Sequence, residues 1–461
     1  MKIKSVNPTT AETLEEFDEL ATHQINTIVE QNRQAFHEWK QSSFQERKLL
    51  LKKAADLLRK DKERYAQLIT MEMGKPLKQA EAEVEKCAWG LDFYAYHGEH
   101  YLTDETIETD AHHSRIQYKP LGTILAIMPW NFPFWQAFRC AAPALMTGNT
   151  MLLKHSSNVP QCSLAIEEVF TQAGFPCDVF NSLLIGAKKA NTLITDTRIA
   201  AVSLTGSTAA GSTVAGTAGT HLKKVVLELG GSDPFIILDD ADLDFTIPHA
   251  IFGRIQNNGQ SCIAAKRFIV NQHIYDKFCT KLTEHVNHLT MDDPMLLTTD
   301  LGPLIQPDAV DILHKQVQQS ITQGATLLTG GNLPKELPGF FYPPTIVKNV
   351  TKGMAAYDEE TFGPVFALIK AQDDAHAIQI ANDTPYGLGA SIWSSSLDHA
   401  QQIASRIQSG NLFINEIVKS DPRLPFGGIK QSGYGRELSY HGIREFVNIQ
   451  TLYINKHKKP D

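Results

Sequence analysis

Short apolar runs alternate with segments of helical spacing from residue 122 onward. The first of these runs cover 123–128, 150–153, 179–185 and 199–204. Continuous apolar strands that alternate with helices are typical of a parallel sheet with helices on both faces. One such helix is expected to begin near Asn158 and to end at Gly174, because glycine readily adopts the left-handed conformation that closes a helix. The pattern predicts an α/β unit that is a candidate for nucleotide binding.

A second series of apolar runs begins at residue 235 and continues through 268–270, 325–328, 365–369 and 410–415. It predicts a second α/β unit. The first hundred residues look helical instead. Ser43 and Glu46 have the spacing of a capping box, in which each side chain bonds the other residue's backbone N–H. A similar helix is expected around 81–94.

Two segments, 114–119 and 448–455, alternate apolar and polar residues and stand outside both series. This alternation predicts half-buried strands. Peripheral strands of this kind often build an arm that pairs with another subunit.

Composition and charge exclude several classes of protein. With 461 residues, 42% of them hydrophobic, the chain is long enough for two or three packed units. A net charge of -8 without a dense basic stripe argues against a nucleic-acid partner. No apolar stretch reaches the roughly 18 residues of a membrane span, and no secretory signal is recognised. Six cysteines without a CxxC pair predict a reducing cytoplasm and no metal site.

Cys262 is the first candidate for chemistry. A cysteine is commonly a packing residue. Here, however, it follows Gly259 and a polar run that is too hydrophilic for a core strand. A cysteine at such a turn can present its sulfur to a cleft while its own backbone N–H stays free.

Glu228 and Asn131 are the next candidates. Glu228 ends an apolar strand, where a carboxylate either faces the surface or acts as a base with a raised pKa. Asn131 lies between two prolines directly after a strand, and a neutral N–H donor held there suits an oxyanion hole. Gly206 and Ser207 link a strand to a helix whose N-terminus favours an anion, although Ser207 can equally be a simple helix cap.

Five motifs, in this order, resemble the aldehyde dehydrogenase superfamily, and the match runs nearly from end to end. The motifs are Pro129-Trp130-Asn131-Phe132-Pro133, Leu227-Glu228-Leu229-Gly230-Gly231, Gly259-Gln260-Ser261-Cys262, Glu359-Glu360-Thr361-Phe362-Gly363-Pro364 and Pro425-Phe426-Gly427-Gly428. Within the superfamily, 122–130 and 229–234 are most similar to the bacterial NAD(P)-dependent succinate-semialdehyde dehydrogenases.

The resemblance implies an α/β fold with two doubly wound domains and a β oligomerisation arm. The cofactor-binding domain would comprise 1–102 and 121–231, the catalytic domain 232–431, and the arm 103–120 and 432–461. The chain would assemble as a homodimer or homotetramer.

It also implies a role for each matching residue. Cys262 would be the nucleophile, Asn131 and the Cys262 N–H would hold the oxyanion, and Glu228 would activate the hydrolytic water. The residues implied to bind NAD or NADP are Trp130, Lys154, Ser157, Gly206, Ser207, Leu229, Glu360 and Phe362. Ser157 stands where strictly NAD-using relatives often have a glutamate, so we expect NADP to be accepted, alongside NAD.

Substrate choice is expected to depend on groups that meet a carboxylate. Arg139 and Ser420 match such contacts of succinate-semialdehyde dehydrogenases, although Arg139 can instead form a salt bridge with a nearby acid. Gln256 replaces a second arginine of some relatives. Trp135 and Phe426 would form apolar tunnel walls.

Three alternatives remain at this point. An acylating dehydrogenase would pass the acyl group to coenzyme A, but such enzymes generally lack a base at the Glu228 position. A non-catalytic scaffold would be expected to have lost Cys262, Asn131 or Glu228. An aldehyde dehydrogenase for glutarate semialdehyde or an aliphatic aldehyde is the strongest alternative.

Overall fold

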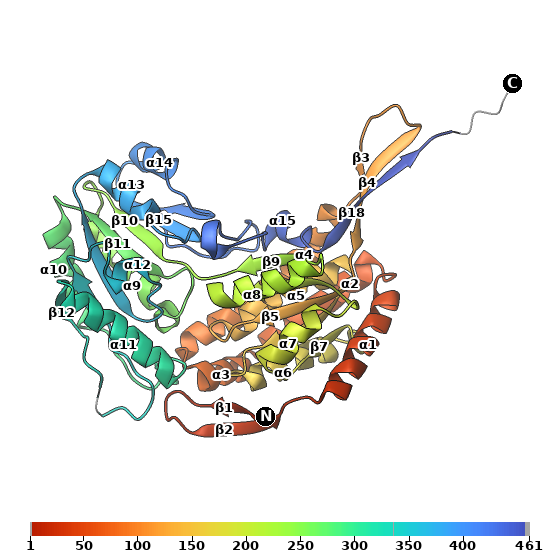
Figure 1. Ribbon diagram of the computed structural model, residues 1–461, viewed down its shortest axis with the longest axis horizontal. Coiled ribbons are helices and arrows are strands. Elements are labelled where there is room, and N and C mark those ends of the chain that lie inside the picture. The colour runs from red at the N-terminus through yellow and green to blue at the C-terminus, as the bar shows by residue number, and fades with distance from the viewer. Residues whose placement is uncertain (1, 335, 457–461) are drawn as a thin grey trace.

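The computed structural model describes residues 2–334 and 336–456 and has two α/β lobes side by side, with a narrow arm projecting from one of them (Figure 1). A hairpin of β1 (Lys2–Val6) and β2 (Thr13–Asp18) lies along the base of the molecule. Both predicted parallel sheets are confirmed.

The first lobe contains a six-stranded sheet in the order β17-β9-β8-β5-β6-β7, parallel except for β17. Its strands are β5 (Thr123–Met128), β6 (Thr150–His155), β7 (Phe180–Ser182), β8 (Ile199–Thr205), β9 (Lys224–Glu228) and β17 (Gly433–Tyr434). The helices of this lobe are α1 (Thr22–Trp39), α2 (Phe44–Lys60), α3 (Lys62–Met73), α4 (Leu77–Tyr101), α5 (Pro133–Thr147), α6 (Pro160–Gln172), α7 (Ala187–Ile194) and α8 (Thr208–Thr220).

Several local expectations for this lobe are confirmed. Ser43 and Glu46 form the predicted capping box at the start of α2. The helix expected to end at Gly174 is α6, and Gly174 has a φ of 88°, in the left-handed region. Large apolar side chains of α2, α4, α5 and α6 fill the core beneath the sheet.

The second lobe contains a seven-stranded sheet in the order β12-β13-β14-β11-β10-β15-β16, in which only β12 is antiparallel. Its strands are β10 (Asp233–Ile237), β11 (Ala265–Asn271), β12 (Thr326–Thr329), β13 (Thr345–Lys348), β14 (Val365–Ala371), β15 (Gly389–Trp393) and β16 (Asn411–Ile414). Its helices are α9 (Leu243–Ile255), η1 (Gln256–Gly259), α10 (Tyr275–Val286), α11 (Pro307–Thr322), α12 (Ala355–Asp358), α13 (Asp374–Asn382) and α14 (Leu397–Ala404). Apolar clusters cover both faces of this sheet.

The arm is a three-stranded sheet of β3 (Glu105–Thr106), β4 (His113–Pro120) and β18 (Val447–Ile454). The two segments predicted to be peripheral strands pair antiparallel as β4 and β18. Within 432–461, β17 joins the six-stranded sheet instead, and α15 (Ser439–Ile443) packs against α4 and α5. Residues 457–461 of that range lie outside the described residues.

Among the described residues, no helix combines the length and the apolar character that crossing a membrane requires.

Candidate active site

The predicted site residues lie where the carboxyl ends of β5, β6, β8 and β9 face the second lobe. In open parallel sheets, ligands bind beside these strand ends. Two hollows meet here at Cys262. The first, named the glycine-lined cavity, has a volume of about 220 Å³. It is lined by Pro129, Trp130, Asn131, Thr205, Gly206, Ser207, Leu229, Gly230, Cys262, Glu360 and Phe362.

The second hollow, named the cationic pocket, has a volume of about 50 Å³. It is lined by Lys86, Phe132, Trp135, Gln136, Arg139, Gln256, Ser261, Cys262, Ile263, Lys419, Ser420 and Phe426. The loop 129–133 contributes to both hollows, with Trp130 in the cavity and Phe132 in the pocket.

Cys262 follows a backbone in an uncommon conformation. Asn257, Asn258 and Gly259 all have positive φ angles, of 58°, 58° and 75°. Asparagine and glycine are the residue types that best tolerate this region. The side chain of Asn257 donates to the Asn131 carbonyl at 2.7 Å, which ties the cysteine loop to the loop after β5.

The close approach of other segments also fixes the cysteine loop. A Cβ atom on Gly259 would overlap the backbone of Gly363. The guanidinium of Arg254 donates to the carbonyls of Ala265, Gly259 and Thr361. Sequence reasoning missed Arg254, Asn257 and Asn258, although two asparagines before a glycine are a recognisable signal for left-handed backbone.

The Cys262 thiol is protonated at neutral pH in this arrangement. Burial raises its pKa to about 12, although the charges of Lys266 and Arg139 lower it. Lys266 Nζ donates to the carbonyls of Ser261 at 2.9 Å and Cys262 at 2.7 Å. No described residue accepts a hydrogen bond from the backbone N–H of Cys262. The sulfur therefore needs a base to become a thiolate, and this N–H is available to a ligand.

Asn131 is buried, 4% exposed, and its Nδ2 donates to the Gln260 carbonyl at 3.0 Å. An asparagine amide nitrogen carries two N–H groups. One is engaged, and the second is available on the cavity side, where Asn131 and Cys262 line the same hollow.

Glu228 ends β9 with its carboxyl group buried, and neither oxygen has a hydrogen-bond partner among the described residues. Burial, and after it the nearby charge of Glu437, raise the pKa of this carboxyl to about 8, against the opposing charges of Arg139 and Arg436. The charge of Glu228 in turn raises the pKa of Cys262. A Cβ atom on Gly427 would lie 2.8 Å from Glu228 Oε1, so glycine there leaves room for the carboxylate.

Arg139 forms an ion pair with Glu437, which the sequence analysis gave as the alternative to a contact with the substrate. Its Nε lies 2.5 Å from Glu437 Oε2, with both side chains buried. Its Nη2 donates to Thr205 Oγ1 at 3.3 Å, and its guanidinium carbon lies 4.9 Å from the centre of the Phe426 ring. Arg139 also lines the cationic pocket, so its partnership with Glu437 coexists with access to that pocket.

All five residues predicted to bind substrate, Trp135, Arg139, Gln256, Ser420 and Phe426, line the cationic pocket. Ser420 Oγ accepts hydrogen bonds from Trp135 Nε1 at 3.0 Å and from Lys86 Nζ at 2.8 Å. Lys86 was missed from the sequence. Its place on α4, far from every motif, gave no signal there.

Six of the eight residues predicted to bind the cofactor line the glycine-lined cavity: Trp130, Gly206, Ser207, Leu229, Glu360 and Phe362. Ser207 caps α8, accepting from the Ala210 N–H at 3.3 Å, as the alternative interpretation expected. The rings of Trp130 and Phe362 stand perpendicular with centroids 5.8 Å apart.

Lys154 and Ser157 lie near the end of β6, outside the residues that line the cavity. Lys154 is largely buried, which lowers the pKa of its ammonium group, and Ser157 is exposed. Glu360 accepts from the Gly231 N–H at 3.1 Å, and its Oε1 lies 3.3 Å from Lys266 Nζ. The cavity has three features that fit a dinucleotide. The N-terminus of α8 suits a phosphate, Gly230 leaves the backbone open to close approach, and the Glu360 carboxylate can accept a hydrogen bond.

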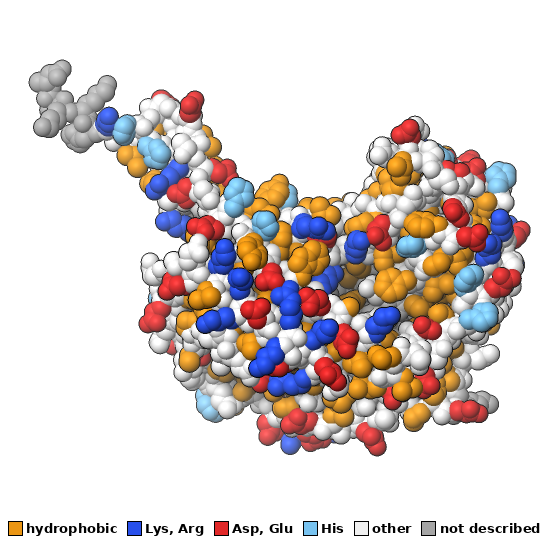
Figure 2. Space-filling model, turned by 180° about the vertical axis from the view of Figure 1, so that it is seen from behind, with side chains coloured by type: hydrophobic (Ala, Val, Ile, Leu, Met, Phe, Trp, Pro, Cys, Tyr) orange, Lys and Arg blue, Asp and Glu red, His pale blue; other side chains and the backbone are white. Residues whose placement is uncertain are grey.

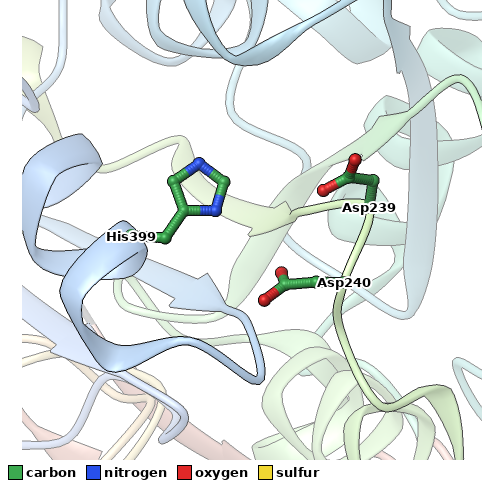
Figure 3. A group of neighbouring side chains, drawn as sticks. All are labelled: Asp239, Asp240 and His399. Carbon is green, nitrogen blue, oxygen red and sulfur yellow. The ribbon is translucent and has the colours of Figure 1, made fainter.

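A separate cluster of Asp239, Asp240 and His399 lies in the second lobe, with its possible ligand atoms within 4.8 Å of one another (Figure 3). Asp240 accepts from Ser394 Oγ and from the Ser396 N–H, at the start of α14. These bonds explain the position of Asp240 as part of a helix cap, so the cluster needs no ion.

Comparison with known proteins identifies a family and several close relatives. A model of the "Aldehyde dehydrogenase family" matches residues 1–452. A protein of Synechocystis sp. named "Probable succinate-semialdehyde dehydrogenase", NADP(+)-type, is 50% identical over 98% of this chain and 100% of its own length. The succinate-semialdehyde dehydrogenase, NADP(+)-type, of Mycobacterium avium is 46% identical over 100% and 98%. The crystal structure of succinic semialdehyde dehydrogenase from Streptococcus pyogenes with NADP+ superposes with a TM-score of 0.96, at 39% identity, covering 98% and 100%.

Proposed function

The chain belongs to the aldehyde dehydrogenase family, and we propose that it oxidises succinate semialdehyde to succinate with NADP, accepting NAD as well. The observation that carries the substrate proposal is the cationic pocket beside Cys262. Three of its lining residues, Lys86, Arg139 and Lys419, are cationic, and none is acidic. Such a pocket favours a carboxylate at the far end of the aldehyde. The names of the similar bacterial enzymes support the same substrate.

The reaction begins at Cys262. The sulfur bonds to the aldehyde carbon, and the negative charge that develops on the carbonyl oxygen is stabilised by the Asn131 amide and the Cys262 N–H. A bound nicotinamide cofactor supplies the hydride acceptor, and a thioester on Cys262 remains. Glu228 then takes a proton from a water molecule that attacks the thioester. The C–S bond breaks, the carboxylic acid leaves, and Glu228 returns the proton to the Cys262 sulfur, which restores the thiol.

Glu228 is suited to accept both the proton of the Cys262 thiol and the proton of the attacking water. Cys262, with a pKa of about 12, must lose its proton before or during attack. Glu228 has a pKa of about 8, close to the working range, so its carboxylate form can accept a proton and its acid form can release one. A base at this position supports hydrolysis over transfer of the acyl group to coenzyme A.

The preference for NADP is supported by the residues after β6. Ser157 is uncharged and exposed, so it does not repel a 2′-phosphate, and the cation Lys154 lies three residues earlier. The relatives named above carry NADP in their names or in their complex. NAD lacks the 2′-phosphate and meets no obstacle there.

We also propose that the arm pairs copies of this chain into a homodimer or homotetramer that works in the cytoplasm. The arm stands clear of the body (Figure 2), and β18 exposes Ile449, Tyr453 and Ile454. An edge strand with exposed apolar side chains is suited to pairing. All six cysteines are free, which supports a reducing compartment.

The test is kcat/KM for succinate semialdehyde, glutarate semialdehyde and butanal, each with NADP and with NAD. A charge-assisted contact is worth roughly 1.5–3 kcal/mol, so succinate semialdehyde should exceed butanal by about ten- to a hundredfold. Equal use of succinate semialdehyde and butanal would contradict the substrate proposal while leaving the family chemistry intact. A clear preference for glutarate semialdehyde would identify the longer acid as the substrate.

A further inference from the structure

Lys86 is a half-buried cation on α4 whose ammonium group lies in the cationic pocket. Its Nζ donates to Ser420 Oγ at 2.8 Å and lies 4.7 Å from the centre of the Trp135 ring. Among the described residues, no carboxylate oxygen comes within 4 Å of it. A cation removed from water without a counter-ion is costly, so its position calls for an anion that the chain itself does not supply.

The other two cations of the pocket are already paired. Arg139 Nε lies 2.5 Å from Glu437 Oε2, and Lys419 Nζ lies 2.6 Å from Glu416 Oε2. A substrate carboxylate near either of them shares the cation with a protein carboxylate. Lys86 has no such competitor, so its charge is the one most available to a ligand.

The bond to Ser420 also prepares a second donor. A serine hydroxyl has two acceptor positions and one proton to donate. Lys86 Nζ and Trp135 Nε1 both donate to Ser420 Oγ, which occupies the two acceptor positions. No described residue accepts the hydroxyl proton of Ser420. The remaining O–H and the ammonium N–H groups of Lys86 therefore form a pair of donors for the two oxygens of one carboxylate.

We propose that Lys86, with the hydroxyl that it orients on Ser420, binds the distal carboxylate of the acid semialdehyde while Cys262 attacks the aldehyde carbon. This inference rests on the proposed function and assigns the specificity-determining charge of that site. The ammonium group enters no bond-making step. It determines which aldehydes reach Cys262 with high affinity.

The surroundings of Lys86 add a dependence on pH. Burial and the charge of Arg139 on α5 lower the pKa of Lys86 to about 8, against the opposing charges of Glu83 on α4 and of Asp421 after β16. The neighbouring Cys87 thiol is uncharged at this pH, because burial raises its pKa well above the usual value. The ammonium form is present below that pH and is lost above it. The preference for an acid semialdehyde over an uncharged aldehyde should therefore decrease as pH rises through about 8.

The decisive variant is Lys86→Met, which keeps the unbranched side chain up to one atom short of the ammonium nitrogen and removes the charge. We expect kcat/KM for succinate semialdehyde to fall about ten- to a hundredfold, mainly through KM, with butanal changed by less than about twofold. The ratio of the two kcat/KM values is measured from pH 6.5 to 9.5, which cancels titrations of Cys262 and Glu228 that both aldehydes share. The variant should abolish the decrease of that ratio with pH.

Two further variants serve as controls. Lys53→Met removes an exposed lysine on α2 that lines neither the cationic pocket nor the wider hollow beside it, and should leave the ratio unchanged. Lys86→Arg keeps the charge to higher pH, so it should retain the preference and extend it beyond pH 8.

The outcomes separate the inference from the proposed function. A wild-type enzyme without preference for the acid semialdehyde would overturn both. If the wild type is selective and Lys86→Met stays selective, the inference fails and the proposed function stands. An equal loss with both aldehydes in Lys86→Met would assign Lys86 a purely structural role and would also overturn the inference.

Discussion

The glycine-lined cavity and the cationic pocket meet at Cys262, yet they are built in different ways. The cavity is formed mainly by the turns that follow β5, β8 and β9, neighbouring strands of one sheet. At Gly230 the Glu360 carboxylate approaches so closely that a Cβ atom would overlap it. The pocket combines side chains of α4, α5 and the segment 419–426 with Phe132 and residues of 256–263, and its three cations give it a positive charge.

The cavity and the pocket therefore depend on different features of the sequence. Strand ends of a parallel sheet meet at one edge, so the cavity follows from the fold together with a few short motifs. The pocket depends on which helix faces are brought together. Lys86 and Ser420, bonded in the structure, are 334 positions apart along the chain. Changes at the junction should therefore affect both ligands, and changes within one half should affect only one.

The largest effect is expected from Glu228→Gln, because the Glu228 carboxyl lies close enough to Cys262 for its charge to raise the pKa of the thiol. A general base contributes about a hundred- to ten-thousandfold, so kcat should fall by about a thousandfold with both aldehydes and both cofactors. Wild-type kcat should rise with pH to a plateau above about 8, because only the carboxylate form of Glu228 accepts a proton. Stopped-flow and steady-state assays across pH measure both effects.

Glu437→Gln is the matched control for that variant. It keeps the base but removes a charge that raises the pKa of Glu228, so the midpoint of the profile should move to lower pH. Retention of the wild-type pH profile in Glu228→Gln would rule out Glu228 as the base.

A smaller loss of kcat/KM, again the same for both aldehydes, is expected from Asn131→Ala. One oxyanion donor is typically worth about 3 kcal/mol, so kcat/KM should fall about a hundredfold for succinate semialdehyde and for butanal alike. The ratio between the two aldehydes is the internal control. A loss confined to the acid semialdehyde would show that Asn131 contacts the carboxylate instead of the oxyanion.

The smallest effect is expected from Gly230→Ala, inside the cavity. The new Cβ would overlap Glu360 Oε2, and displacing this carboxylate should raise KM for NADP about tenfold, the equivalent of one charge-assisted hydrogen bond. Gly216→Ala on α8 is the control, because a Cβ there meets nothing within 4 Å. Comparable changes in both variants, or an altered ratio between aldehydes in Gly230→Ala, would contradict the division between the two halves.

The pattern of apolar runs locates the cavity but not the pocket, whose five predicted residues came only from the family resemblance. Both parallel sheets and the strand ends at Asn131 and Glu228 follow from the apolar runs, since these runs extend over consecutive residues. The pairing of Arg139 with Glu437 and of Lys86 with Ser420 depends on how α4 and α5 pack against the distant segment 420–437, which consecutive residues do not encode. Arg139 could be assigned two roles from the sequence, and only the fold reveals its carboxylate partner.

The shared loop 129–133 also bears on how such an enzyme can change over generations. A shift of this loop's backbone would move a wall of each hollow at once, because Trp130 lines the cavity and Phe132 the pocket, and Asn257 holds the same backbone to the cysteine loop. A substitution on the pocket face of α4 alters only one. New substrate ranges are therefore most accessible through α4 and 419–424, where variation can accumulate without loss of the cofactor.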